Sequence, residues 1–580
     1  MGPKNSAVEC DPPHSIPSNQ ADAVLRDQSF GTSAVLPFSV MIIVGLYGTG
    51  LLGISLGSSR TLTVHESFAA QPAREMLGHG TWLVPHFGRQ PRLNKPPGLS
   101  WLIAGCMAVS GSEAEWIARI PSVAAAIATA LILAAWGQAW CRQQRSWIVG
   151  LMLLTSVFVW MQGRLAEADM ILCAFVTAAM FCLYQALCVL ENHQRPATKW
   201  ILGFYALAGS SVVIKLVIGP VFLLSSAAAF AILRGFGYQD WRAARKLLSP
   251  AGGIVFVLTF AAWPTFAALS QPELLSAWWS QVFGRAVGDL GGNKPLPFYF
   301  YTLPWILLPW TPPAILGIWN ARKQFDGPQW QLLACWFLPG FLILQMAAFK
   351  HKHYLLPILP PFLLAAGYSV PFVENAIVNV LRNRRHHVLL AGAVLLVSAV
   401  IAAVIVPQEL RVFVVMAGVP CFAFLLLASR VRFLTPNGLA VCLFVLLWIE
   451  GALFFSVVVS RHDSYRSYAE LAQRINQRDD AKAHDLFLVG LGENQIAYYL
   501  PLRAIRVDSL NTFVTDVLPG RSDPCMAVIP ADSLYRLKDV AANKLDSSAA
   551  GDMRREPLAL VAVQEPRPVK ITVPKVGISD

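Results

Sequence analysis

AVLPFSVMIIVGLYGTGLLGISLG, residues 34–57, is a run without a charged residue, and it is long enough to cross a bilayer, which takes roughly 17 to 25 residues. Similar apolar runs recur as far as residue 459. Of the 580 residues, 55% are hydrophobic and only 14% are charged, whereas soluble domains carry about 25% charged residues. The run follows a polar tail, residues 1–33, and lacks the short apolar region and cleavage site of a signal peptide, so we expect it to be retained. The composition predicts a polytopic α-helical membrane protein.

Segmentation of the apolar runs predicts thirteen spans. The stretch Gly98–Ser110 is too short to cross comfortably and follows a proline pair, so we expect it to lie in the membrane interface. The predicted spans are 34–57, 119–140, 147–163, 169–190, 200–213, 216–233, 250–270, 298–319, 330–349, 354–374, 388–406, 411–429 and 437–459.

Basic residues set the predicted orientation. With the tail 1–33 in the cytoplasm, the alternate loops that carry most of the Lys and Arg residues fall inside, as the positive-inside rule requires. The net charge of +12 is explained by these loops and does not indicate nucleic-acid binding. An odd number of spans then places residues 460–580 outside. This region is polar, and the pattern DLFLVG at 485–490 predicts a buried strand that ends at a glycine turn, so we expect a small extracytoplasmic α/β domain after a transmembrane domain at 34–459.

A few basic residues lie on the outer side, where topology does not explain them. They gather in the first outer loop (58–118) and at the outer ends of later spans. Snorkelling toward lipid headgroups is one explanation for any one of them. As a set they favour a site for a phosphate group at the outer membrane interface. They are Arg89, Arg92, Lys95, Arg164, Lys215, Arg285, Lys294, Lys350 and Lys352.

Four separated motifs carry a family resemblance. They are AREML at 73–77 with WLVPHF at 82–87 and KPP at 95–97, then GRLAEAD at 163–169, Lys215 with Gly219-Pro220, and KHKHYLLP at 350–357. In this order the chain resembles polyprenyl-phosphate-dependent glycosyltransferases of the GT-C class, the bacterial relatives of protein O-mannosyltransferases and lipid A aminoarabinose transferases. The resemblance implies a GT-C-like fold, a bacterial inner-membrane location and transfer of a sugar on the outer face, with inversion at the anomeric carbon.

The catalytic carboxylate is where this chain departs from the family. The family usually has Asp-Glu where this chain has His65-Glu66. Glu66 is our candidate general base, His65 is an alternative because imidazole titrates near neutral pH, and Asp169 is the second carboxylate. The structural alternatives are a helix N-terminal charge for Glu66, a backbone-bonded ring for His65, and an ion pair with Arg164 for Asp169.

The departing phosphate requires preorganised positive charge. Lys95, Lys215 and Lys350 are the first candidates, Arg92 and Arg285 the next, and Arg164 and Tyr354 complete the expected donor site. Tryptophans 82, 101, 278 and 279 could stack on a sugar or belong to the interfacial belt. No cofactor is required, although His351 and His353 with His79 or His86 could hold a divalent metal. The chain lacks a P-loop and a dinucleotide fingerprint, which disfavours a soluble nucleotide-activated donor.

The expected partners are a polyprenyl-phosphate-linked sugar donor, the lipid bilayer, and an acceptor that is a glycolipid, another envelope glycan or a protein. A transporter or flippase for an anionic lipid-linked substrate is the alternative class, but we find no duplicated half or paired broken helices. A non-catalytic binder with an enzyme-like fold is the third reading, which the departure at His65 leaves open.

Overall fold

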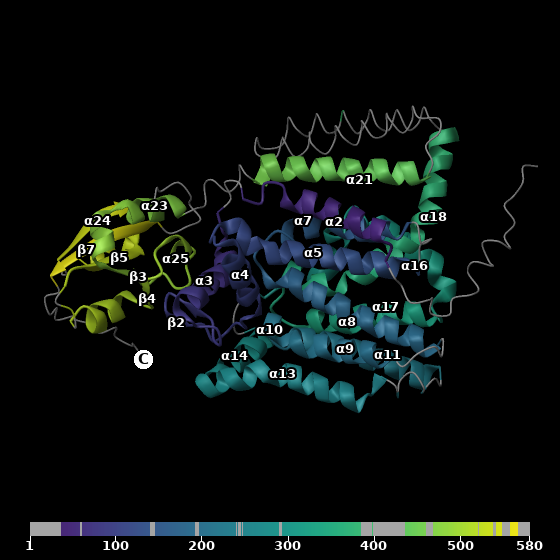
Figure 1. The fold of residues 1–580 in the computed structure, drawn as a ribbon, viewed down its shortest axis with the longest axis horizontal. Coiled ribbons are helices and arrows are strands. Elements are labelled where there is room, and N and C mark those ends of the chain that lie inside the picture. The colour runs from purple at the N-terminus through teal and green to yellow at the C-terminus, as the bar shows by residue number, and fades with distance from the viewer. Residues whose placement is uncertain are drawn as a thin grey trace, which may run out of the picture.

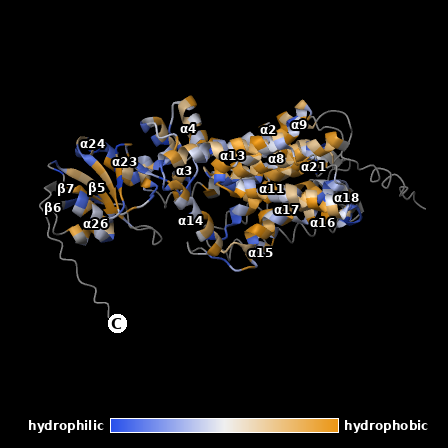
Figure 2. Cartoon of the chain, turned by 90° about the horizontal axis from the view of Figure 1, so that it is seen from below, coloured by the Kyte–Doolittle hydropathy of each residue, from blue (hydrophilic) through white to orange (hydrophobic). Residues whose placement is uncertain are grey.

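The computed structural model describes residues 36–57, 61–139, 145–191, 197–238, 247–288, 293–383, 436–459, 468–519, 523–537, 541–547 and 557–565, together with residues 241, 245, 397 and 521. Figure 1 shows a bundle of helices at one end of an elongated molecule and a smaller sheet domain at the other. Figure 2 shows that apolar residues cover much of the bundle. The expectation of a mostly helical, polytopic membrane protein is confirmed.

The helices of the bundle follow the apolar runs. They are α2 (Phe38–Gly53), α5 (Glu115–Gly137), α6 (Trp147–Leu154), α7 (Val157–Gln162), α8 (Ala168–Glu191), α9 (Thr198–Ser210), α10 (Val212–Lys215), α11 (Ile218–Ile232) with η2 (Leu233–Gly237), α13 (Pro250–Ser270), α15 (Phe298–Ile306), α16 (Thr311–Asn320) with η3 (Ala321–Gln324), α17 (Pro328–Met346), η4 (Lys352–Ile358), α18 (Pro360–Asn383), and α21 (Pro436–Leu453) with η5 (Phe454–Val459).

Five helices among the described residues are long and apolar enough to cross a membrane, or six if η4 and the first part of α18, bent by 59°, form one span. Several predicted spans are built from shorter helices, because prolines and turns interrupt them, as in 298–319, which divides into α15 and α16. The predicted spans 388–406 and 411–429 lie almost wholly outside the described residues. The count of thirteen therefore stays a prediction, as does the interfacial place of Gly98–Ser110, which forms helix α4.

Close packing at small residues and aromatic rings holds the bundle together. Trp136 of α5 stacks on Tyr184 of α8 and on Trp336 of α17, with ring centroids 4.8 and 5.6 Å apart. Gly317 of α16 approaches α18 so closely that a Cβ atom there would lie 1.8 Å from the Ala365 carbonyl oxygen. Such contacts suit membrane helices, whose association depends on van der Waals packing at small residues.

The C-terminal residues form a five-stranded sheet in the order β4-β3-β5-β7-β6, in which β3 runs parallel to β4 and β5, and β7 is antiparallel to β5 and β6. The strand expected at 485–490 is confirmed: β3 is buried along four of its five residues, and Gly490 follows with φ +68°. The elements are α23 (Ala469–Gln477), α24 (Asp479–Ala483), β3 (Asp485–Val489), α25 (Ile496–Tyr499), β4 (Ile505–Val507), α26 (Leu510–Thr512), η6 (Phe513–Val517), β5 (Cys525–Pro530), η7 (Ala531–Leu537), β6 (Ala541–Ser547) and β7 (Leu558–Glu565).

The segment predicted to be the first outer loop, called the outer loop below, lies between the bundle and this sheet domain (Figure 1). It contains helix α3 (Val64–His79), the short strands β1 (His86–Phe87) and β2 (Gln90–Pro91), and α4. Helix α14 (Leu274–Val287) follows α13 close to it. Phe87 is fully buried in a hydrophobic cluster of the C-terminal domain, so the loop and that domain share a core.

Candidate active site

Helix α3 begins with a capping box that uses the Glu66 carboxylate. The Thr63 hydroxyl accepts a hydrogen bond from the Glu66 amide at 3.2 Å, and Glu66 accepts one from the Thr63 amide at 2.9 Å. Arg119 of α5 donates from Nε to Glu66 Oε1 at 2.7 Å and from Nη2 to Oε2 at 3.3 Å. The Ala166 amide donates to Oε1 at 3.2 Å. Both ends of this ion pair are buried, with Glu66 0% and Arg119 1% exposed.

This geometry favours the structural alternative for Glu66 over the role of general base. A general base must come within hydrogen-bond reach of the acceptor's proton, but Glu66 has no exposed surface and both of its oxygens already accept hydrogen bonds. Sequence reasoning missed Arg119. Its only signal was an arginine at the first residue of a predicted apolar span, where a cation needs a partner.

His65 lies beside Glu66 in sequence but faces a different environment, because it is exposed on the surface of α3. Its ring makes an edge contact with Phe68, with centroids 5.5 Å apart. Partial burial lowers the pKa of His65, the charges of Lys95 and Arg92 lower it further, and the charge of Asp169 opposes them. These influences together favour the neutral imidazole, which is the form able to accept a proton.

Asp169, in the first turn of α8, forms an ion pair with Lys215 at the end of α10. The ammonium group of Lys215 also lies 4.4 Å from the ring centroid of Tyr354. The helical path is interrupted directly after Lys215, where Leu216 adopts φ +48° between α10 and α11. This conformation costs energy for a residue with a Cβ atom. Asp169 is thus paired with Lys215 rather than with Arg164.

Lys95, Lys215 and Arg285, here called the cation cluster, gather around Asp169 and Tyr354. Arg285 Nη1 donates to the Tyr354 hydroxyl at 3.4 Å. Burial lowers the pKa of Lys95 to about 7, and the charges of Arg285, Arg92 and Lys215 contribute to that shift. Like charges held this close disfavour one another, so the cluster suits an anionic ligand.

The other predicted cations are engaged by partners of their own, although the charge of Arg92 still acts on Lys95. Arg164 donates from Nη2 to the Ile54 carbonyl oxygen at 2.5 Å and lies over the ring of Phe455. The Lys350 ammonium donates to the Ala347 carbonyl oxygen, and burial lowers its pKa. Arg92 is 6% exposed and forms a bidentate ion pair with Glu493 of the C-terminal domain.

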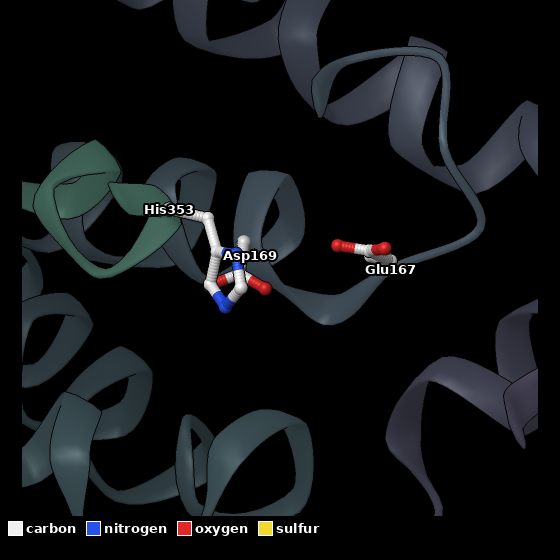
Figure 3. A group of neighbouring side chains, drawn as sticks. All are labelled: Glu167, Asp169 and His353. Carbon is white, nitrogen blue, oxygen red and sulfur yellow. The ribbon is translucent and has the colours of Figure 1, made fainter. Parts of the chain in front are cut away.

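Glu167, Asp169 and His353 form the one group among the described residues that could hold a metal ion, with candidate ligand atoms within 4.8 Å of one another (Figure 3). Sequence reasoning had not singled out Glu167. One imidazole and two carboxylates would suit a zinc or manganese ion, although Lys215 already pairs with Asp169.

The histidine set expected for a metal differs from this group. Within the described part of the chain, His351 and His353 stack on each other, with centroids 4.9 Å apart. His79 and His86 instead make hydrogen bonds with the Leu502 and Val84 carbonyl oxygens. Only His353 of the expected set therefore belongs to the group that the structure brings together.

Three tryptophans fasten the outer loop to its surroundings. The indole nitrogens of Trp101, Trp263 and Trp278 donate to the carbonyl oxygens of residues 82, 83 and 93, each at 2.8 Å. Trp263 and Trp278 also contact each other, with centroids 4.9 Å apart. Trp101 and Trp278 therefore hold backbone in place, whereas Trp82 and Trp279 are exposed.

These features agree with the class of protein that comparison of this chain with known protein families indicates. The dolichyl-phosphate-mannose-protein mannosyltransferase family matches residues 94–264, a segment that contains Lys95, Asp169 and Lys215. The chain resembles GT-C glycosyltransferases, as its motifs had predicted.

Particular relatives narrow this resemblance. The chain is 27% identical over 359 residues to an undecaprenyl phosphate-alpha-4-amino-4-deoxy-L-arabinose arabinosyl transferase of Proteus mirabilis, a match that covers 59% of this chain and 60% of the relative. The corresponding enzyme of Pectobacterium atrosepticum is 26% identical, with 68% of this chain and 73% of the relative covered. The chain thus spans about 60% of the length of the first of these curated relatives.

A solved structure shows the same fold. The crystal structure of ArnT from Cupriavidus metallidurans bound to undecaprenyl phosphate matches 90% of this chain and 97% of that chain, with a TM-score of 0.69 and 17% identity. At that identity the likeness establishes the fold of an integral membrane protein and leaves the chemistry to be argued from the residues.

Proposed function

We propose that this protein is a membrane glycosyltransferase that moves a sugar from a polyprenyl-phosphate donor to an envelope acceptor. The observation that carries the proposal is the cation cluster, in which Lys95, Lys215 and Arg285 surround a single buried carboxylate, Asp169. Even with the Glu167 carboxylate within 4.8 Å of Asp169, two carboxylates do not balance three cations, and a lipid phosphate would supply the missing negative charge. Solved ArnT is described as bound to undecaprenyl phosphate, which supports this ligand class.

The leaving phosphate gains charge as its bond to the sugar breaks, and the cation cluster would stabilise that charge. The acceptor oxygen forms a bond to the anomeric carbon while the bond from that carbon to the phosphate oxygen breaks, and the electron pair leaves with the phosphate. A direct displacement inverts the anomeric centre. Preorganised cations at a leaving group lower the barrier because they need no reorganisation during the reaction.

His65 is the group we assign to accept the proton of an acceptor hydroxyl. It is exposed on the outer loop, its pKa is lowered, and a neutral imidazole is an effective base near neutral pH. The negative charge of Asp169 would stabilise the imidazolium that forms. In this scheme His65 does what the family's aspartate does, and Glu66 stabilises the start of α3. A phosphate acceptor would already be ionised and would need no base.

The relatives and the predicted orientation support a choice of acceptor and location. Relatives named for transfer of aminoarabinose support a glycolipid of the lipid A type as the acceptor, ahead of another glycan or a protein. We place the protein in a bacterial inner membrane, with thirteen spans and with both the first outer loop and the C-terminal domain on the outer face.

Purified protein in nanodiscs, with an undecaprenyl-phosphate-linked aminopentose and lipid A as substrates, tests the proposal. Asp169→Asn and His65→Gln should each lower the rate of transfer by roughly 10²- to 10⁴-fold, while His79→Gln, at an exposed histidine of the same helix, should not. Full activity in both site variants would overturn the assignments, and wild-type protein that neither binds undecaprenyl phosphate nor transfers sugar would overturn the function.

A further inference from the structure

An ion pair between the buried Arg92 and the half-buried Glu493 joins the C-terminal domain to the loop segment that carries Lys95. Arg92 donates from Nε to Glu493 Oε1 at 2.7 Å and from Nη2 to Oε2 at 2.6 Å. Its Nη1 donates to the Phe68 carbonyl oxygen at 3.0 Å, and its guanidinium lies 4.7 Å from the centroid of the Phe68 ring. All three nitrogens of the guanidinium are therefore engaged, which leaves Arg92 poorly suited to bind a phosphate itself.

The segment containing Arg92, residues 86–97, is here called the strap. At its turn, Gly88 and Arg89 adopt φ values of +61° and +63°, and both amides donate to the Glu75 carboxylate, at 2.6 and 3.0 Å. The Gly88 carbonyl oxygen accepts a hydrogen bond from the Arg506 amide of the C-terminal domain at 3.0 Å. The strap is therefore fixed at this end partly by α3 and partly by strand β4.

The other end of the strap leads directly to the cation cluster. The Arg92 amide donates to the Pro85 carbonyl oxygen at 2.7 Å, and Trp278 donates to the Leu93 carbonyl oxygen at 2.8 Å. Lys95 follows two residues later. Because the chain between Arg92 and Lys95 is short, the position of the Lys95 ammonium depends on where Arg92 is held.

We propose that Glu493 is a positioning residue for the donor-phosphate site: through Arg92 it holds the strap so that Lys95 reaches the cation cluster. The C-terminal domain thereby becomes a structural part of the site, although we place none of its residues against the substrate. The effect on sugar transfer rests on the proposed function. The effect on the position of the strap rests only on the ion pair between Arg92 and Glu493.

A double-mutant cycle on the full-length protein distinguishes a tie from a phosphate ligand. Glu493→Ala, Arg92→Met and the double variant should each raise the KM for the donor roughly 10- to 100-fold, with kcat little changed. The double variant should be little worse than Arg92→Met, because residues that act through a shared contact are not additive, and the other ion pair of Glu493, with Arg506, is long at 3.8 Å. Asp546→Asn, which breaks the exposed pair with Arg474 in the same domain, should leave KM unchanged.

Two readouts do not need transfer. Binding of undecaprenyl phosphate should weaken in the Glu493 and Arg92 variants, and amide hydrogen exchange of residues 86–97 should speed up in both but not in Asp546→Asn. Glu493→Gln, which keeps one acceptor oxygen, replaces Glu493→Ala if that variant does not fold. Unchanged exchange of the strap, or an additive loss in the double variant, would overturn the proposal. If the wild-type protein transfers no sugar but the strap still exchanges faster in the Glu493 and Arg92 variants, the proposed function fails and the role of the ion pair stands.

Discussion

The buried pair of Glu66 and Arg119 allows one prediction to be worked through in energy terms. Arg119→Met roughly keeps the volume of the side chain but removes the cation that donates to both oxygens of Glu66, a carboxylate with no exposed surface. Removing one member of a buried ion pair is expected to lower the free energy of unfolding by about 3–5 kcal/mol. The carbonyl oxygens of Leu56 and Thr61, which accept from Arg119 at 3.0 and 3.1 Å, would lose their donors as well.

Glu66→Gln makes the converse change, since it removes the carboxylate charge that accepts two hydrogen bonds from the buried Arg119 guanidinium, while one amide oxygen can still serve the capping box. We expect a loss of similar size. The double variant Glu66→Gln with Arg119→Met should be more stable than the sum of the single losses predicts, because no buried charge is left uncompensated.

Thermal unfolding in detergent, together with the monodisperse fraction in size-exclusion chromatography, measures these losses. Each single variant should melt several degrees below the wild type, and the double variant should recover part of that difference. The reasoning fails if Glu66→Gln is as stable as the wild type yet inactive in transfer. That result would return Glu66 to the role of catalytic base.

Three further predictions follow from the site and the bundle. The kcat/KM for the donor should fall as the pH rises through about 7, because burial and neighbouring cations lower the pKa of Lys95 to about 7 and only the protonated ammonium attracts phosphate. In Lys95→Arg this fall should move to higher pH. A fall that stays at the same pH would have to come from another group. Removal of metal ions with EDTA, checked by metal analysis, should leave the rate of transfer unchanged, because the cation cluster repels a divalent ion and Lys215 already neutralises Asp169. A loss of activity with EDTA that zinc or manganese restores would contradict this prediction. Gly317→Val should lower the melting temperature, since its Cβ would lie 1.8 Å from the Ala365 carbonyl oxygen and overpacking costs about 1–3 kcal/mol or more, while Gly253→Ala, with open space around it, should melt close to the wild type.

The sequence by itself determined the membrane character and the buried strand β3, and its family resemblance predicted most residues of the candidate site. The first two follow from local patterns: apolar runs match the thickness of a bilayer, and a short continuous apolar run followed by a glycine is typical of a buried strand. The order of the four motifs also indicated the class of protein. Lys95, Lys215, Asp169 and Tyr354 were all named from sequence, and the structure brings them together.

Only the tertiary structure decided which charged groups are free to act on a substrate. Glu66 and Arg92 look like site residues in the sequence, but their partners, Arg119 and Glu493, lie 53 and 401 residues away along the chain. The oxygens of Glu66 and the guanidinium nitrogens of Arg92 are already taken up by hydrogen bonds to these partners and to neighbouring backbone, and pairing across such separations depends on packing that local patterns do not record. The same physical reason separates Asp169 from Arg164, its neighbour in sequence, and joins it to Lys215.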